Sequence, residues 1–376
     1  MTSRVAALGV GLVFLGGCTH GPAVNVRTSA AQSTPTTGSR TSSASPASLE
    51  AVTLLADFSD PPSRWELLAT IPFGPATAHL GYLFVGSREG AYSEAGPASF
   101  AIDADGSIWV LDIVKRRLAR YSPDGAFLGA VPGLHPLLSQ LPFGQDVAIS
   151  NGRMYVLQTG GPRTTIRIVT HGVVTEGEQT VTLDGQEVVI HLVFPSPNEI
   201  VGAVAGLLEP LGSGSTGFAE LDLPGAGSAT LLPGAPVGPS RWIDVVGVDD
   251  RSFEVHFSDP AGTAVQPIRV ATVLRDHGRL KHLDGFIGAE IQAVFPDSVG
   301  LLVGAAAVLP RSGENVEGTW YLQVSSDGHP LIWERVPEDG EGKDIRHLRT
   351  FVGGPDDAVY QMRIVRTGVQ ILRRPP

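Results

Sequence analysis

The segment Gly96–Val131 constrains the fold most, because it divides into short apolar runs separated by tight turns. Gly106 and Gly125 stand where hairpin turns need a positive φ. The run Ile108–Leu111 is apolar at every position, as expected for a strand that lies between two neighbouring sheets. The predicted strands are Ser99–Asp103, Ser107–Asp112, Leu118–Ser122 and Phe127–Val131. Four antiparallel strands in so short a segment are typical of one blade of a β-propeller.

The same pattern of apolar runs and turns recurs along the rest of the chain. Equivalent positions in the second strand of each unit are Ile108, Met154, Ile200, Phe253, Leu301 and Val359. The last unit shows only three strands before the sequence ends, which would leave an open sheet edge. Trp65–Ile71 can supply the fourth strand from the N-terminal side. We therefore predict an all-β fold, a six-bladed β-propeller whose last blade is closed by this N-terminal strand.

Composition agrees with many turns and few long helices, since the chain holds 46 Gly and 29 Pro and only 17% charged residues. A β-sandwich is a weaker alternative because it does not usually contain six four-stranded units. An α/β fold needs helical periodicity between the strands, and none is found there.

The N-terminus has the features of an export signal, with Arg4 before the apolar run Val5–Leu15. This run is shorter than the ~20 residues needed to cross a bilayer. It ends in Leu15-Gly16-Gly17-Cys18, which resembles the bacterial lipobox, although the family usually has Ala or Ser where Gly16 stands. Cys18 is the only cysteine, so no intramolecular disulfide can form. The alternatives are an ordinary signal peptide with a free thiol, or a short buried helix.

We predict three parts of the chain: a lipoprotein signal peptide at residues 1–17, which the lipobox resemblance implies, a tether at 18–48 and the propeller at 49–376. Cys18 would carry the diacylglyceryl group that holds the protein in a membrane. The tether is rich in Ser, Thr and Pro and is predicted to be disordered. We expect a lipid-anchored, extracytoplasmic protein of the bacterial cell envelope, on either the cell membrane or the outer membrane.

From Gly86 to Val131 the sequence resembles an NHL repeat, the pattern in which Pro97, Asp103, Gly106, Asp112 and Arg117 stand at characteristic positions. The match is loose in later blades, which lack the Asp after the second strand. The resemblance implies a six-bladed propeller in the broad superfamily that includes gluconolactonase-like hydrolases. Bacterial lipoproteins of this kind are mostly treated as binding or interaction proteins.

Two groups of polar residues are candidates for a functional surface. The first is Asp112 with the basic run Lys115-Arg116-Arg117, expected in a loop on the channel face. This run could meet an anionic partner or form an ordinary solvated loop. The second group comprises polar residues at the predicted starts of inner strands: Gln145, Asp146, Asp244, Glu290, Gln292 and His347.

Carboxylates of the second group could hold one Ca²⁺ or a similar cation in a central channel, as in metal-dependent propeller hydrolases. Only three members are carboxylates, and polar side chains lining a water-filled channel are the simpler interpretation. Asp103-Ala104-Asp105-Gly106 is predicted to be a hairpin turn, because Val114 stands where a calcium loop needs an acid.

Several function classes find no support in the sequence. A formal charge of −11 disfavours binding to nucleic acid, which needs clustered Lys and Arg. There is no Gly-x-Ser-x-Gly motif and no Walker loop, so no catalytic residue is assigned. The leading hypothesis is a membrane-tethered binding protein with an unknown protein, small-molecule or glycan ligand and no cofactor. The alternative is a metal-dependent, lactonase-like propeller hydrolase.

Overall fold

The computed structural model describes residues 52–376 except 60, 87–91, 132–142, 161–162, 171–172, 175–178, 183–186, 197–198, 207–216, 222–228, 233–234, 237–241, 250, 259–266, 277–278, 284, 296–299, 310–312, 314, 326–328 and 338–349. Residues Glu50–Pro376 belong to one compact unit. Its described residues contain strands and turns but no helix, which confirms the predicted all-β class. No described helix is long and apolar enough to cross a membrane.

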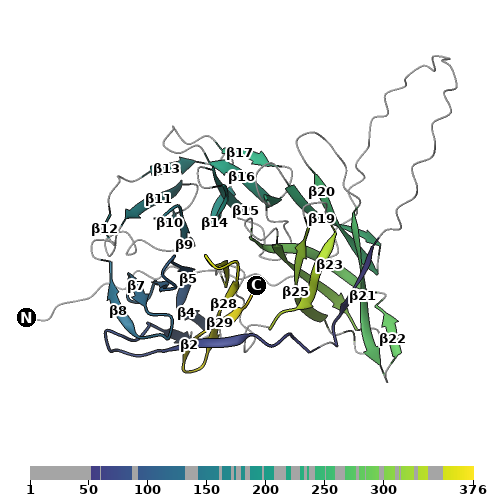
Figure 1. Ribbon diagram of the computed structural model, residues 1–376, viewed down its shortest axis with the longest axis horizontal. Helices are drawn as coiled ribbons and strands as arrows, with labels where there is room; N and C mark the ends of the chain where they lie inside the picture. The colour runs from purple at the N-terminus through teal and green to yellow at the C-terminus, as the bar shows by residue number, and fades with distance from the viewer. Residues whose placement is uncertain are drawn as a thin grey trace, which may run out of the picture. The chain divides into compact units, whose positions relative to one another are not determined.

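The segment predicted as four strands forms one sheet in chain order (Figure 1). Its strands are β5 (Pro97–Ile102), β6 (Ile108–Asp112), β7 (Arg117–Tyr121) and β8 (Phe127–Ala130). Gly106 and Gly125 have φ values of 79° and 88°, which explains the glycine in each turn. The Asp103–Gly106 segment is a hairpin turn, closed by the Gly106 amide donating to the Asp103 carbonyl at 2.9 Å.

Two further sheets follow along the chain. The first contains β9 (Phe143–Ser150), β10 (Arg153–Gly160), β11 (Arg163–Thr170), β12 (Val173–Val174) and β13 (Gln179–Thr182). The second contains β14 (Glu187–Ser196), β15 (Glu199–Gly206), β16 (Gly217–Leu221) and β17 (Ala229–Leu232). A separate hairpin that the sequence analysis did not predict pairs β3 (Leu83–Gly86) with β4 (Tyr92–Ala95).

Three more sheets complete the described part of the chain. The first contains β18 (Ala235–Pro236), β19 (Trp242–Asp249), β20 (Ser252–Ser258), β21 (Ile268–Asp276) and β22 (Arg279–His282), with β1 (Thr53–Asp57) added from the N-terminal end. The second contains β23 (Phe286–Phe295), β24 (Gly300–Val308), β25 (Asn315–Val324) and β26 (Pro330–Arg335). The third contains β27 (Phe351–Gly353), β28 (Val359–Val365) and β29 (Gly368–Arg374), with β2 (Glu66–Pro72).

Each sheet contacts the next one along the chain, mostly through its first strands and, between the β14–β17 sheet and the β18–β22 sheet, through the third strand β16. The contacting pairs are β5 with β9, β9 with β14, β16 with β18, β19 with β23, β23 with β27 and β27 with β5. Strand β6 is buried at all its positions. Val110 packs with Met362 and Ile371 on one side, while Trp109 and Leu111 pack with Val147 and Met154 on the other. The residues of β6 from Ile108 to Leu111 are therefore all apolar because other sheets cover both faces of the strand.

The N-terminal segment joins two sheets that lie far from it in sequence. Strand β2 pairs antiparallel with β29. Its bounds, Glu66–Pro72, are shifted by one residue from the predicted strand Trp65–Ile71. Strand β1, which the sequence analysis did not predict, pairs parallel with β21. Strand β26 also contacts this segment: Trp333 Nε1 donates to the Leu55 carbonyl on β1, and Arg335 donates to the Phe58 carbonyl just after β1, both at 2.8 Å. Residues 53–72 therefore bind three sheets in succession.

Candidate functional site

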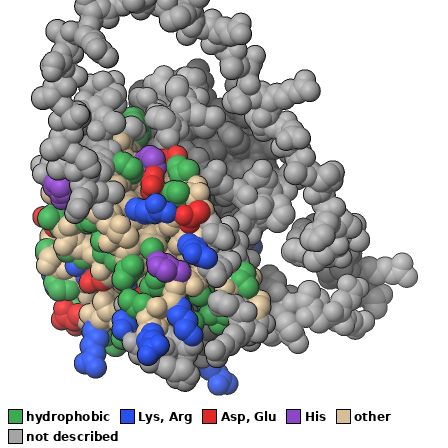
Figure 2. Space-filling view, turned by 90° about the vertical axis from the view of Figure 1, so that its right-hand side faces the viewer, with side chains coloured by type: hydrophobic (Ala, Val, Ile, Leu, Met, Phe, Trp, Pro, Cys, Tyr) green, Lys and Arg blue, Asp and Glu red, His purple; other side chains and the backbone are tan. Residues whose placement is uncertain are grey.

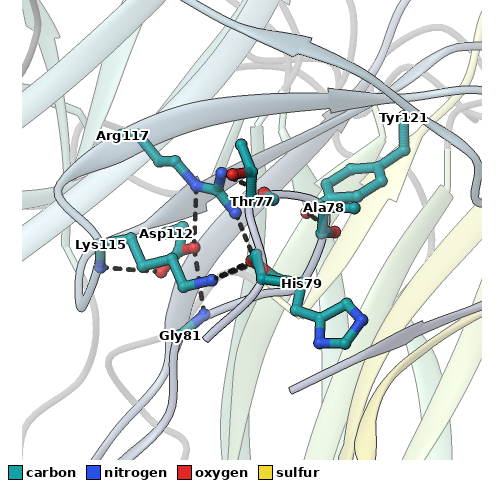
Figure 3. Close-up of polar contacts among 9 residues, drawn as sticks. Thr77, Ala78, His79, Gly81, Asp112, Lys115, Arg117 and Tyr121 are labelled. Carbon is teal, nitrogen blue, oxygen red and sulfur yellow. Dashed lines mark hydrogen bonds and ion pairs between the residues drawn. The ribbon is translucent and has the colours of Figure 1, made fainter. Parts of the chain in front are cut away.

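Asp112 lies at the end of β6 and is the centre of a cluster of polar contacts (Figure 3). Its carboxylate is fully buried and accepts three hydrogen bonds. The Gly81 amide donates to Oδ2 at 3.1 Å, the Lys115 amide donates to Oδ1 at 3.1 Å, and Arg117 Nε donates to Oδ2 at 3.2 Å. The Arg117 side chain is only 13% exposed, so this ion pair is largely shielded from water. Two of the candidate residues, Asp112 and Arg117, thus lie in direct contact.

Lys115 and Arg117, on either side of Arg116, donate hydrogen bonds to main-chain carbonyls of the segment Ala76–Gly81. Lys115 Nζ donates to the Ala76 and His79 carbonyls, each at 2.7 Å. Arg117 donates to the Thr77 and His79 carbonyls, each at 2.5 Å (Figure 3). Hydrogen bonds from a charged donor are stronger than neutral ones, so this segment is held firmly.

A tyrosine at the other end of β7 from Arg117 completes the cluster. Tyr121 donates its hydroxyl to the Ala78 carbonyl at 3.1 Å. Four consecutive carbonyls, from Ala76 to His79, therefore accept hydrogen bonds from β7 and the loop before it. The side chains of Pro75 to Ala78 remain exposed. The result is a surface segment, here called the 75–81 loop, whose backbone is fixed while its outer side chains face solvent.

The backbone around the cluster leaves little freedom. A Cβ at Gly81 would lie 2.6 Å from Val114 Cβ and 2.9 Å from Asp112 Oδ1, so only glycine fits there. Arg116 has a φ of 55°, an uncommon value for a residue with a side chain. This conformation turns the chain so that Lys115 and Arg117 both reach the 75–81 loop while Arg116 itself is exposed.

Burial dominates the electrostatics of the cluster. It raises the pKa of Tyr121 to about 12, an effect that Arg117 opposes and Asp112 reinforces. Burial also lowers the pKa of Lys115, helped by repulsion from Arg117 and opposed by Asp112. Both shifts follow from removing water around groups whose partners are mostly main-chain atoms.

Asp146, from the second group of candidates, is also fully buried and joins three sheets. Ser99 on β5 donates its hydroxyl to Oδ1 at 2.5 Å, and the Leu192 amide on β14 donates to Oδ2 at 2.8 Å. The Val147 amide in turn donates to Ser99 Oγ at 3.1 Å. The carboxylate thus connects β5, β9 and β14 directly.

Of the remaining candidates that the structure describes, only Gln145 shares a strand with Asp146. Asp244 is exposed and accepts a hydrogen bond from the Val245 amide at 2.8 Å. Gln292 is exposed and accepts one from Thr319 Oγ1 at 2.9 Å. Gln145 and Glu290 lie on β9 and β23, whereas His347 and Cys18 lie outside the described residues. Among the described residues, no group of three or more His, Cys, Asp or Glu side chains has the arrangement of a metal site.

Sequence reasoning missed the acceptors of the first cluster. The partners of Lys115, Arg117 and Tyr121 are main-chain carbonyls, and a carbonyl leaves no residue-type signal in a sequence. The one available signal was Gly81, which permits the close approach to Asp112.

The fold and the cluster together define a class: an all-β protein of several mostly four-stranded sheets with a surface loop held by buried charges. No protein-family model matches the chain, and no curated protein matches it. Solved structures similar to it include propeller-type proteins. One similar structure is a Bacteroides fragilis protein whose name describes it as a presumed exported protein, with 10% identity, 86% of this chain and 99% of that chain covered, and a TM-score of 0.43.

Two further similar structures are enzymes by name. The aldose sugar dehydrogenase of Streptomyces coelicolor, in its PQQ-bound form, has 13% identity, covers 83% of this chain and 99% of its own, and gives a TM-score of 0.39. Virginiamycin B lyase of Staphylococcus aureus has 9% identity, covers 78% of this chain and 98% of its own, and gives a TM-score of 0.32. At these identities the similarity concerns the fold alone.

Proposed function

We propose that the chain is a lipid-anchored β-propeller of the bacterial cell envelope that acts as a binding protein. Six sheets would form the blades, and β2 would complete the last blade beside β29. The inter-sheet contacts support this, because they run from each sheet to the next and return from β27 to β5. The antiparallel pairing of β2 with β29 supports the closure by an N-terminal strand. The resemblance of Gly86–Val131 to an NHL repeat agrees with both.

The proposed anchor is a diacylglyceryl group on Cys18, at the end of the apolar signal sequence. Mass spectrometry of the protein from the membrane fraction tests it. We expect an acylated N-terminal peptide beginning at Cys18, and release of the Cys18→Ser chain from the membrane. A wild-type peptide that retains the signal sequence and carries no lipid would refute the anchor.

The binding role depends on one observation, the fixed backbone of the 75–81 loop. Lys115 and Arg117 hold the loop through its carbonyls, while the side chains of Pro75 to Ala78 stay exposed. A loop ordered before a partner arrives loses little conformational entropy on binding. Loops on a rigid β frame are the usual place for such surfaces. We therefore propose that this loop contacts a protein, small-molecule or glycan ligand.

Site-specific photo-crosslinking in the cell envelope tests this role. A photoreactive side chain in place of Thr77 should give a discrete adduct with the ligand. One in place of Asp124, which is exposed in the turn between β7 and β8, should not. The double change Lys115→Met and Arg117→Met should abolish the adduct, because it frees the loop backbone. Equal labelling from both positions, or no adduct from position 77, would exclude the loop as the binding surface.

We propose that the carboxylate of Asp146 has a structural role and holds neighbouring sheets together. Both of its oxygens accept hydrogen bonds from neighbouring sheets, which accounts for its burial without a cation. We accordingly place the binding surface at the loop and not at the inner-strand residues.

A further inference from the structure

Exposed apolar side chains gather where the chain enters the described unit. Val52, immediately before β1, is 38% exposed, and Leu55 on β1 is 42% exposed. Leu331 on β26 is 63% exposed, the most exposed large apolar side chain among the described residues. Figure 2 shows the side of the molecule on which β21 lies in Figure 1, with hydrophobic side chains at the surface among Lys, Arg and His.

These side chains belong to two neighbouring strands. Trp333 Nε1 donates to the Leu55 carbonyl at 2.8 Å, so β1 and β26 lie side by side at this point. Leu331 stands two residues before Trp333 on the same strand, and alternate residues of a strand share a face. Val52 directly precedes β1, and its carbonyl accepts a hydrogen bond from the Arg269 amide of β21 at 3.2 Å.

Rigid packing behind the strands keeps the exposed side chains outward. Trp333 stacks on Trp320, with ring centroids 6.0 Å apart and planes inclined by 6°. Ala56, next to Leu55, is fully buried in the core that includes Trp320. Leu55 therefore cannot turn inward without unpairing β1 from β21. We call Val52, Leu55 and Leu331 the apolar rim.

We propose that the apolar rim rests against the lipid bilayer that holds the anchor. This inference rests on the proposed function, because it needs the lipid on Cys18. The composition of residues 18–48 predicts a flexible tether, whose end-to-end distance would be roughly 30 Å. The point where such a tether joins the folded unit would then be, on average, the part of that unit closest to the membrane. A tether also raises the effective concentration of the rim at the membrane surface, so three apolar side chains suffice for a weak contact with lipid.

The test uses the full anchored chain in vesicles of phosphatidylcholine. Because Cys18 would be acylated, a thiol-reactive fluorophore would label only an introduced cysteine. We compare Leu331→Cys with Leu128→Cys, since Leu128 is 55% exposed on β8 of a different sheet. The label on the Leu331→Cys variant should shift to shorter wavelength and lose most of its emission to a quencher on the lipid chains. The label on the Leu128→Cys variant should keep its emission.

A second change tests the apolar nature of the contact. Adding Leu55→Gln to the Leu331→Cys variant should restore most of the quenched emission, whereas adding Leu67→Gln on β2 should not. Equal quenching at positions 331 and 128 in protein shown by mass spectrometry to be acylated would overturn the rim and leave the anchor intact. Absence of the acyl group itself would refute the anchor, and the rim inference with it.

Discussion

At the scale of single residues, two of the three basic side chains at positions 115–117 are bound within the protein itself. Lys115 and Arg117 were candidates for binding an anionic partner, and they donate to carbonyls of the 75–81 loop. Asp112 balances Arg117 from a buried position. Of the three basic residues only Arg116 is exposed, so its role in contacting an anionic partner stays a prediction.

Gly81 should not tolerate a side chain. A Cβ there would lie 2.6 Å from Val114 Cβ and 2.9 Å from the buried Asp112 carboxylate. We expect Gly81→Ala to lower the free energy of unfolding by about 1–3 kcal/mol, as overpacking usually does. Gly288→Ala is the matched control, because nothing lies within 4 Å of its added Cβ. Urea unfolding monitored by tryptophan fluorescence measures both, and equal losses would contradict the packing argument.

Tyr121 should make stability depend on pH in the alkaline range. Its pKa is raised to about 12 by burial, while an unfolded tyrosine ionises near ~10. Below ~10 both states keep the proton, so the tyrosine contributes its full stability. Between ~10 and about 12 only the unfolded state loses the proton, so stability falls as pH rises and is lost through the folded pKa.

Replacing this tyrosine isolates the effect. Tyr121→Phe should cost about 1 kcal/mol at neutral pH, because the hydrogen bond to the Ala78 carbonyl is lost. Above pH ~10 the free energy of unfolding of this variant should fall less steeply with pH than that of the wild type. The two slopes should differ by up to about 1.4 kcal/mol per pH unit. Urea unfolding at a series of alkaline pH values gives the two slopes. Parallel slopes would show that the hydroxyl does not titrate in this environment.

At the scale of elements, the sequence was most informative where a strand and its turns carry their own signal. Gly106 and Gly125 fix the hairpins of the first full sheet, and the apolar run of β6 correctly indicated a strand buried on both faces. Strand β1 was missed because Thr53–Asp57 is short and pairs in parallel with β21, far away in sequence. Such a pairing depends on the free edge of β21, which the local sequence around β1 does not encode.

Strand β1 should protect that edge. Its removal would expose the backbone groups of Arg269 to Val273 and the core around Ala56. We expect a chain that begins at Phe58 to unfold at lower urea concentration and to self-associate through the open edge. A chain that begins at Glu50 keeps β1 and is the control. Light scattering and urea unfolding compare the two, and identical behaviour would mean that β1 contributes little.

At the scale of the whole molecule, the sheets are held together mainly by contacts between neighbours. Asp146 connects β5, β9 and β14, and the segment that contains β1 and β2 contacts β21, β26 and β29 of three different sheets. In such an arrangement the strands near the two ends of the folded unit matter most, because each would otherwise leave a sheet incomplete. The pairing of β2 with β29 brings an N-terminal strand and the last strand into one sheet.

A disulfide across this pairing tests the proposed closure. Thr70 and Gln370 are register partners on β2 and β29, and directly opposed residues of antiparallel strands lie at a separation that a disulfide can span. The double change Thr70→Cys and Gln370→Cys should form a bond on oxidation and raise the free energy of unfolding by about 2–4 kcal/mol. The control replaces Thr70 and Arg366, which are not register partners. Non-reducing gels and urea unfolding, with and without reductant, report the bond and its effect. If the Thr70 and Gln370 pair forms no more bond than the control, the two ends do not share a sheet in solution, and the proposed closed propeller must be abandoned.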